Sequence, residues 1–208
     1  MKLFSSRKIS RRSFLKNGFR LSALAFWGIG FEGRNNLEIE LVRLDFTNLP
    51  DSFYGFRIVQ VADLHASFWV GRDYLMQMVR KTNKLEKDLV AITGDFITGA
   101  VNNFWKRWIP ALKGDYLSTV IGVLGELGSG DKMAVLGNHD QWDGKKTELK
   151  LVSELERVGI RVLRNRSEIL VRGSSSLHVA GTDDYWFSCD LDKALRGIPQ
   201  NQFKILLK

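Results

Sequence analysis

The stretch Ala134-Val135-Leu136-Gly137-Asn138-His139-Asp140 joins an apolar run to a polar motif. The apolar run predicts a buried β-strand over 133–136, and the glycine after it permits a sharp turn. Gly-Asn-His-Asp at such a place is expected by chance in about one of a thousand chains of this length. A solvated turn is therefore the weaker interpretation, and a metal or catalytic site is the stronger one.

Two earlier apolar runs end in a similar way. Strands are predicted over 56–61 and 89–93, and they are followed by Asp63-x-His65 and by Gly94-Asp95. Taken alone, each of these is a weak signal that a polar strand end or a turn explains. Side chains two apart on an extended strand point the same way, so Asp63 and His65 are predicted to share one ion. Open α/β sheets collect ligands at the carboxyl ends of their strands, so the polar residues of all three motifs are expected to converge.

The remaining pattern is that of one α/β domain. Helical spacing of apolar residues predicts three helices, over 72–85, 116–127 and 147–158, the last with Thr147 as N-cap and Gly159 as C-cap. Alternating or short apolar runs predict further strands over 38–46, 161–163, 177–180 and 203–207. Residues 100–114 show no pattern that assigns them.

Charge and cysteine content exclude several classes of function. The chain has 208 residues and a net charge of +8. Residues 1–36 hold eight basic side chains and one acidic one, whereas the other 172 hold 23 basic and 22 acidic ones. The near-neutral remainder argues against a nucleic-acid partner. Cys189 is the single cysteine, which excludes an intramolecular disulfide and a cysteine-rich zinc site, so any metal ligands must be oxygen and nitrogen atoms.

The basic segment at the front reads Ser-Arg-Arg-Ser-Phe-Leu-Lys over 10–16, with a mildly apolar stretch over 21–31. That stretch falls short of the roughly 20 residues that span a bilayer. The pattern resembles the twin-arginine export signal over seven positions. We therefore expect 1–36 to be a twin-arginine signal peptide or membrane anchor read by the twin-arginine translocase. The protein is then expected in the periplasm or on the extracytoplasmic face of the inner membrane. A basic arm lying on a membrane and a disordered tail are the alternatives.

The segments GFRIVQVADLH, DLVAITGD, AVLGNHD, GIRVLRN and VAGTDD resemble, in order and spacing, the calcineurin-like metallophosphoesterases. The motifs of that superfamily are Asp-x-His, Gly-Asp and Gly-Asn-His-Asp/Glu. The chain is most similar to its bacterial twin-arginine-exported phosphodiesterase branch, and the resemblance covers about residues 37–208. It implies an α/β fold, the four-layer α/β/β/α sandwich.

The resemblance also implies roles for the motif residues. Asp63 and His65 hold one metal ion, Asp95 bridges two and Asn138 binds the second. His139 lies beside the phosphate and protonates the leaving oxygen or stabilises the transition state. The two divalent ions, which can be manganese, iron or zinc, supply a metal-bound hydroxide that attacks phosphorus in line. The substrate is a phosphodiester or phosphomonoester, and a lipid-linked one is within the range of the branch.

The chain departs from the family after these motifs. The later Ser-His and Gly-His-x-His ligands are missing from a sequence with three histidines, and His178 precedes both expected positions. Residues 203–208 resemble the strand that leads to the first missing histidine. We therefore expect 37–208 to be an incomplete domain that lacks its C-terminal strands, with poor solubility and little activity. The alternatives to an active enzyme are an inactive truncated remnant and a membrane-tethered, non-catalytic module of the same fold.

Three more positions are left open by the sequence. Some relatives orient the histidine of the third motif with an aspartate that here corresponds to Thr98, so the partner of His139 is not identified. Asp183 and Asp184 match a family position outside the metal ligands, and either a turn after Gly181 or a role in substrate binding explains them. His178 is interpreted as a structural or surface histidine.

Overall fold

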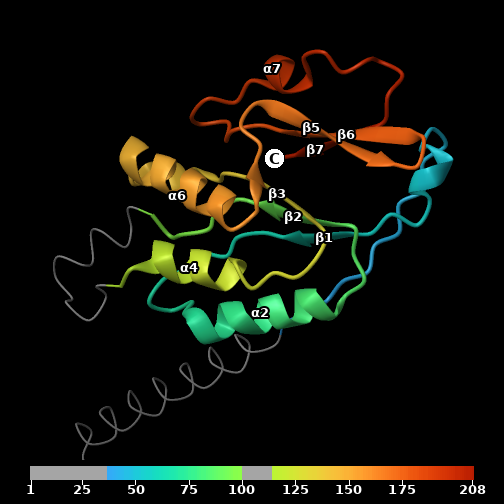
Figure 1. The fold of residues 1–208 in the computed structure, drawn as a ribbon. Helices are drawn as coiled ribbons and strands as arrows, with labels where there is room; N and C mark the ends of the chain where they lie inside the picture. The colour runs from blue at the N-terminus through green and yellow to red at the C-terminus, as the bar shows by residue number, and fades with distance from the viewer. Residues whose placement is uncertain (1–36, 100–113) are drawn as a thin grey trace, which may run out of the picture. The chain divides into compact units, whose positions relative to one another are not determined.

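The computed structural model describes residues 37–99 and 114–208. Contacts divide the chain into two units, 1–43 and 44–208, and each is taken by itself. The predicted leader, residues 1–36, lies outside the described residues. All helices and strands described below belong to the second unit (Figure 1).

The elements of this unit alternate between strand and helix, as the sequence predicts. In chain order they are the 3-10 helix η1 (Asp51–Phe53), β1 (Ile58–Val61), α2 (Arg72–Lys84), β2 (Leu89–Thr93), α4 (Tyr116–Leu124), β3 (Asp131–Val135), α5 (Asn138–Trp142), α6 (Lys145–Arg157), β4 (Arg161–Val162), β5 (Arg166–Arg172), β6 (Ser175–Gly181), α7 (Leu191–Leu195) and β7 (Lys204–Leu207).

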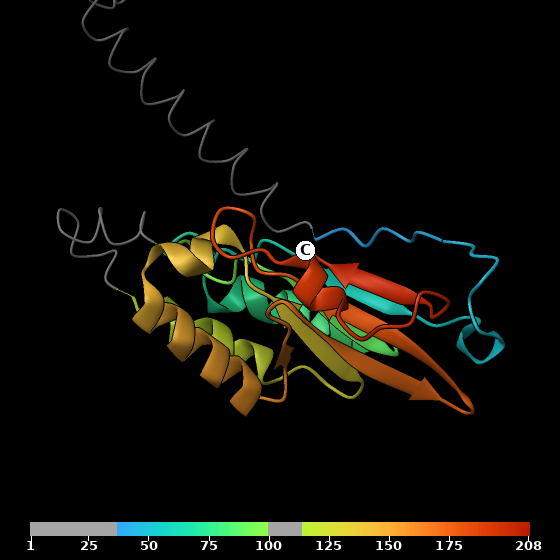
Figure 2. The ribbon, with the colours of Figure 1, turned by 90° about the horizontal axis from the view of Figure 1, so that it is seen from above.

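The strands form two sheets. The first has the order β1-β2-β3-β4 with every pair parallel. Parallel neighbours need a crossover, and α2, α4 and α6 lie in the connections between successive strands. The second sheet has the order β5-β6-β7, with β5 antiparallel and β7 parallel to β6. In Figure 2 the second sheet lies over the first, and α4 and α6 lie side by side.

The main apolar core lies between the two sheets. Leu89, Ala91, Met133 and Val135 of the first sheet pack there, and so do four leucine or valine side chains of the second: Leu170, Leu177, Val179 and Leu207. Because side chains alternate along a strand, the buried residues Val90 and Ile92 face the opposite side, where the crossover helices lie. On its outer face, the second sheet is contacted by α7. The layers therefore follow the order helix, sheet, sheet, helix, and the α/β fold class is confirmed.

The strand predicted over 38–46 is wrong. Residues 37–46 have no regular secondary structure, and the side chain of Leu41 is 90% exposed. Alternating apolar residues support a strand only where a neighbouring strand supplies hydrogen bonds and covers one face. In the described part of the chain, no strand pairs with this segment.

The helix predicted over 147–158 begins two residues earlier, so Thr147 is not its N-cap. Gly144, with φ of 87°, is the N-cap, and the Thr147 hydroxyl instead donates to the Asp143 carbonyl at 3.4 Å. At the other end the C-cap is Val158 and not Gly159, which follows it with a left-handed φ of 81°. The N–H of Gly159 donates to Glu156 O at 3.0 Å and the N–H of Ile160 to Leu155 O at 3.0 Å, the two hydrogen bonds of a Schellman motif.

Four elements are absent from the sequence-based prediction: the short helices η1 and α7, strand β5 and helix α5. Strand β5 is half polar and largely exposed, so its apolar pattern is weak. Helix α5 is five residues long and begins at Asn138 inside the polar motif, where no helix was predicted. Strand β5 and helix α5 are produced by neighbours in space, β6 for the strand and the loop after β2 for the helix.

Candidate metal centre

The loops that follow β1 and β2 run side by side past the ends of the strands. The N–H of Asp63 donates to the Gly94 carbonyl at 3.3 Å, and the N–H of His65 donates to the Asp95 carbonyl at 2.8 Å. Ala66 continues the series with an isolated bridge to Ile97. Hydrogen bonds therefore fix the first two motifs against each other.

The polar residues of these loops have an unusual backbone. Asp63, His65 and Asp95 have φ of 54°, 44° and 53°, in the left-handed region that few residues other than glycine adopt. Asp63 and His65 therefore do not lie on an extended strand, as the sequence-based argument for their pairing assumed. They still come together, with His65 Nε2 at 3.8 Å from Asp63 Oδ1, because two left-handed turns bring their side chains to one side.

Two glycines allow the loops after β2 and β3 to touch. Gly94 has φ of 87°, and a Cβ there would lie 2.7 Å from the Cα of Gly137. A Cβ on Gly137 would overlap Oδ1 of Asp95. The glycines of the second and third motifs are thus required by the close approach of backbone to carboxylate.

This approach brings Asp95 to the start of α5. Asp95 Oδ1 accepts a hydrogen bond of 3.0 Å from the N–H of His139, and its Oδ2 lies 3.5 Å from His65 Nε2. Ligand atoms of His65, Asp95 and His139 all lie within 4.8 Å of one another. The Asp95 carboxylate oxygen and the His65 imidazole nitrogen are ligands that fit a divalent cation such as manganese, iron or zinc, and His139 lies beside them.

The structure places the other two predicted ligands at the margin of this group. Asp63 is near His65, and its side chain is 70% exposed. Asn138 is the first residue of α5 and precedes His139. All five predicted residues therefore gather at the carboxyl edge of the parallel sheet, while their separate roles stay predictions.

The His139 ring is oriented by a hydrogen-bond partner that no sequence motif predicts. Its Nδ1 lies 2.9 Å from the backbone carbonyl oxygen of Thr98. A carbonyl can only accept, so Nδ1 carries the proton and Nε2 is left for an incoming group. The position where some relatives have an aspartate thus supplies a backbone oxygen instead of a carboxylate.

Asp140 is a structural residue of the site that the sequence analysis did not assign. Its side chain is fully buried and accepts hydrogen bonds from the N–H of Gly137 at 3.0 Å and of Ile97 at 3.2 Å. Burial raises the pKa of Asp140 to about 7, although the two backbone donors act in the opposite direction. The Asp140 carboxyl group thus joins the loops after β2 and β3. The sequence signal for this role was its position as the fourth residue of the Gly-Asn-His-Asp motif.

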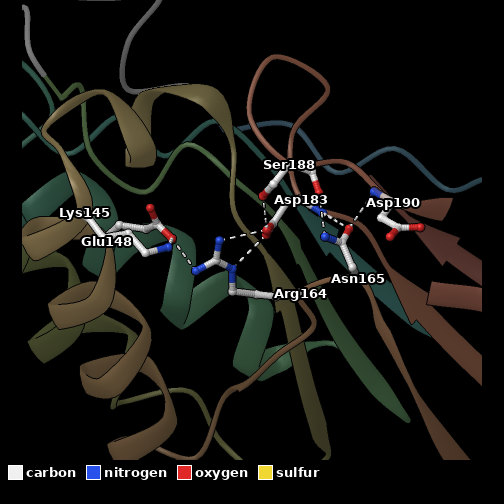
Figure 3. A network of polar contacts seen from close by, with 7 residues as sticks. All are labelled: Lys145, Glu148, Arg164, Asn165, Asp183, Ser188 and Asp190. Carbon is white, nitrogen blue, oxygen red and sulfur yellow. Dashed lines mark hydrogen bonds and ion pairs between the residues drawn. The ribbon is translucent and has the colours of Figure 1, made fainter. Parts of the chain in front are cut away.

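A second polar network holds the loop after β6 (Figure 3). Arg164 donates from Nε and Nη2 to the two carboxylate oxygens of Asp183, both at 2.8 Å, and its Nη1 pairs with Glu148 of α6. Hydrogen bonds from its guanidinium to Asp183, more than the opposing burial, raise the pKa of Arg164. Asp183 also accepts from the Ser188 hydroxyl at 2.7 Å, so its carboxylate is engaged within the protein and the structural interpretation is favoured.

Asn165 closes the same loop at both ends. Its Oδ1 accepts from the N–H groups of Asp183 and Asp190, each at 3.0 Å, and its Nδ2 donates to Ser188 O at 2.6 Å. The residue itself has a left-handed backbone, with φ of 50°. Gly181, at the start of this loop, lies against Val135 at the end of β3. The loop therefore begins near the carboxyl edge of the parallel sheet, where the predicted metal ligands lie.

His178 lies apart from these residues. It is buried in β6, with 8% of its surface exposed, and pairs across the sheet with Ile169. Within the described residues it belongs to no group of potential metal ligands. The interpretation of His178 as a structural histidine is consistent with this position.

The chain is similar in sequence to known phosphoesterases. A sequence model of the calcineurin-like phosphoesterases matches residues 56–199. An uncharacterized metallophosphoesterase of Helicobacter pylori is 25% identical over 97% of this chain and 50% of its own length. Phosphodiesterase YaeI of Escherichia coli is 26% identical over 86% and 62%. UDP-2,3-diacylglucosamine pyrophosphatase LpxG of Chlamydia trachomatis is 34% identical over 51% and 30%. The chain thus spans about half the length of the Helicobacter relative.

Proposed function

The chain belongs to the calcineurin-like phosphoesterase family, and from this premise we propose that it is a metal-dependent hydrolase of phosphoesters. The observation that carries the proposal is the meeting of His65, Asp95 and His139 within 4.8 Å at the carboxyl edge of a parallel sheet. Such an edge is where α/β proteins place their ligands. Carboxylate and imidazole together suit the divalent metals on which this family depends.

We propose a centre for two cations. Asp63 and His65 would hold the first, Asp95 would contribute to both, and Asn138 would hold the second. When bound, the cations supply charge stabilisation to the phosphoryl oxygens and lower the pKa of the attacking water. The N–H of His139 donates a hydrogen bond to one oxygen of the Asp95 carboxylate and so fixes the orientation of that carboxylate.

His139 is the proposed proton donor to the leaving oxygen. Its Nδ1–H is held by the Thr98 carbonyl, so Nε2 is the nitrogen that meets the phosphoester. Protonation of Nε2 makes the ring a cation that hydrogen-bonds the leaving oxygen and can give it a proton as the bond to phosphorus breaks.

The proposed substrate is a phosphodiester or a lipid-linked phosphoester. Support comes from two relatives, of which one is called a phosphodiesterase and the other a pyrophosphatase of a diacylated sugar nucleotide. Manganese, iron and zinc are all compatible with the ligands, so metal identity is left to measurement.

The decisive test measures metal binding and turnover in the same purified chain. We expect calorimetry to detect Mn²⁺ binding and bis-p-nitrophenyl phosphate to be hydrolysed only slowly, as the little activity expected of residues 37–208 requires, with EDTA abolishing that turnover. Asp95→Asn should lose both properties. Asp131→Asn is a matched control at the opposite, amino end of β3, where the side chain pairs with Arg161, and it should keep both. Metal binding without turnover on any phosphoester would favour the non-catalytic module, and absence of metal binding would overturn the proposal.

We also propose that the protein is exported by the twin-arginine route and works at the extracytoplasmic face of the membrane. The support is the sequence over 10–16. Among the described residues, no helix has the length and apolarity to cross a bilayer. Replacing Arg11 and Arg12 by lysine should leave the full chain in the cytoplasmic fraction, whereas Lys8→Arg should not. Equal export of the twin-lysine variant would contradict the route.

A further inference from the structure

The ring of His139 is held on more than one side. Besides the hydrogen bond from Nδ1 to Thr98 O, its centroid lies 4.0 Å from the Trp142 ring at an interplanar angle of 50°. The ring of His65 meets it edge-on, with centroids 4.7 Å apart and planes at 89°. One contact comes from the loop after β1, one from the loop after β2 and one from α5 itself.

Trp142 reaches His139 because the two lie three residues apart on α5 and so share a face of the helix. The helix is attached at its start, where the buried Asp140 binds the N–H groups of Gly137 and Ile97. Trp142 is itself 37% exposed. It therefore covers the histidine from the outside and is not a member of the inter-sheet core.

Each contact restrains a different motion. The hydrogen bond to Thr98 fixes the direction of one nitrogen, but the imidazole can still rock about that bond. The tilted ring of Trp142, with its centroid 4.0 Å away, opposes this motion. A proton donor works only within a short distance of the oxygen it protonates, so restraint of this kind lowers the barrier of the chemical step.

We infer that Trp142 is a positioning residue for His139. Its ring packs against the imidazole and keeps it close to the Thr98 carbonyl. Nδ1–H therefore stays hydrogen-bonded, and Nε2 stays directed toward the leaving oxygen of the substrate. This rests on the proposed function, in which His139 donates the proton. Trp142 acts only through the histidine and contributes no ligand to the metals.

The kinetic test compares Trp142→Ala and Trp142→Phe with Trp69→Ala. Trp69 is a suitable control because it is 59% exposed on the loop after β1 and meets the ring of Phe68 edge-on. We expect Trp142→Ala to lower kcat about tenfold or more, with KM changed less than about twofold. Trp142→Phe should recover most of the loss, since it restores an aromatic face, and the control should match the wild type.

The leaving group separates positioning from general damage. p-Nitrophenolate leaves without a proton, whereas an alkoxide needs one, so the loss in Trp142→Ala should be larger for a methyl phosphodiester than for the p-nitrophenyl one. Equal losses for the two substrates, or an unchanged kcat, would overturn the inference.

A second readout does not depend on activity. The chain has three histidines, so ¹⁵N-histidine labelling gives three imidazole spin systems, assigned with single histidine variants. In the metal-free wild type, long-range ¹H–¹⁵N spectra should show His139 protonated on Nδ1, with contacts to the Trp142 ring. In Trp142→Ala the two tautomers should average. An unchanged tautomer would contradict the inference even if the chain proved inactive, and an inactive wild type with the expected spectra would contradict only the proposed function.

Discussion

The backbone conformations of single residues determine how the loops after β1, β2 and β3 meet at the candidate site. Asp63, His65 and Asp95 adopt left-handed backbones that cost about 1–3 kcal/mol each, and such strain persists only where surrounding contacts maintain it. Here the contacts are the backbone hydrogen bonds between the loops after β1 and β2. The ligands are thus prearranged by main-chain geometry, with Gly137 leaving room for the carboxylate.

Gly137→Ala should damage the centre specifically. The new methyl group would overlap the Asp95 carboxylate, so we expect a loss of about 1–3 kcal/mol in unfolding free energy, the usual cost of overpacking. Mn²⁺ affinity should fall at least tenfold by calorimetry. The control is Gly122→Ala in α4, where no atom lies within 4 Å of the new methyl, and it should stabilise by up to about 1 kcal/mol. Unchanged Mn²⁺ affinity in Gly137→Ala would show that Asp95 is not confined as described.

Asp140→Ala should be among the most destabilising polar substitutions. It leaves the buried N–H groups of Gly137 and Ile97 without an acceptor, at a cost of about 1–3 kcal/mol for each. Asp140→Asn keeps one acceptor oxygen and should lose about half as much in urea unfolding. Near-wild-type stability of the alanine variant would mean that water or a shifted helix α5 replaces the carboxylate.

Ion pairs, as well as apolar packing, join separate helices and loops near the candidate site. Arg164, between β4 and β5, links Glu148 of α6 to Asp183 in the loop after β6 (Figure 3). The two carboxylate side chains are 6% and 4% exposed, so the guanidinium neutralises buried charge. Asn165 then closes the loop through its side-chain amide.

Arg164→Met should destabilise the fold by about 3–5 kcal/mol, because it leaves the buried Asp183 carboxylate without its cation, whereas Glu148 keeps its ion pair with Lys145 at 2.7 Å. Arg166→Met provides the control two residues later. That side chain is 48% exposed, and its ion pairs with Glu156 and Glu168 are 3.7 and 3.9 Å long, so its removal should cost about 0–1 kcal/mol. Urea unfolding measures both. Adding Asp183→Asn to Arg164→Met should recover stability, and failure to do so would count against a charge-based origin.

At the scale of the second unit, the candidate metal centre joins loops from three neighbouring strands of one sheet. Loops after β1, β2 and β3 are far apart in sequence and come together only in the folded chain. Metal bound there is therefore expected to stabilise the entire second unit, since the unfolded chain offers no such set of ligands.

The corresponding measurement is unfolding in the presence of metal. At a free Mn²⁺ concentration of 100 times Kd, the folded state should gain about 2.7 kcal/mol, and EDTA should remove the gain. Asp95→Asn should show no such dependence, while Asp131→Asn should match the wild type. A gain of equal size in the Asp95 variant would place the binding site elsewhere.

Much of the fold was predictable because its signals are local. Strand 89–93 is a continuous apolar run and is observed with the same bounds, and the three helices have clear apolar periodicity. The strand over 38–46 failed for the opposite reason, since alternation alone cannot show whether a partner strand exists. For β5 the pairing with β6 provides what its own sequence does not.

By itself, the sequence determined the α/β class and the meeting of three polar motifs at one sheet edge. Both follow from local signals, because apolar periodicity and the position of a polar residue after a strand depend only on residues close together in the sequence. Only the tertiary structure decided how the motifs meet. The left-handed turns of Asp63 and His65, the Thr98 carbonyl on His139 and the Arg164 network join groups whose positions depend on strand register and loop packing. A backbone carbonyl has no sequence signature, and the spacing of two loops across a sheet follows from the register of the parallel strands beneath them.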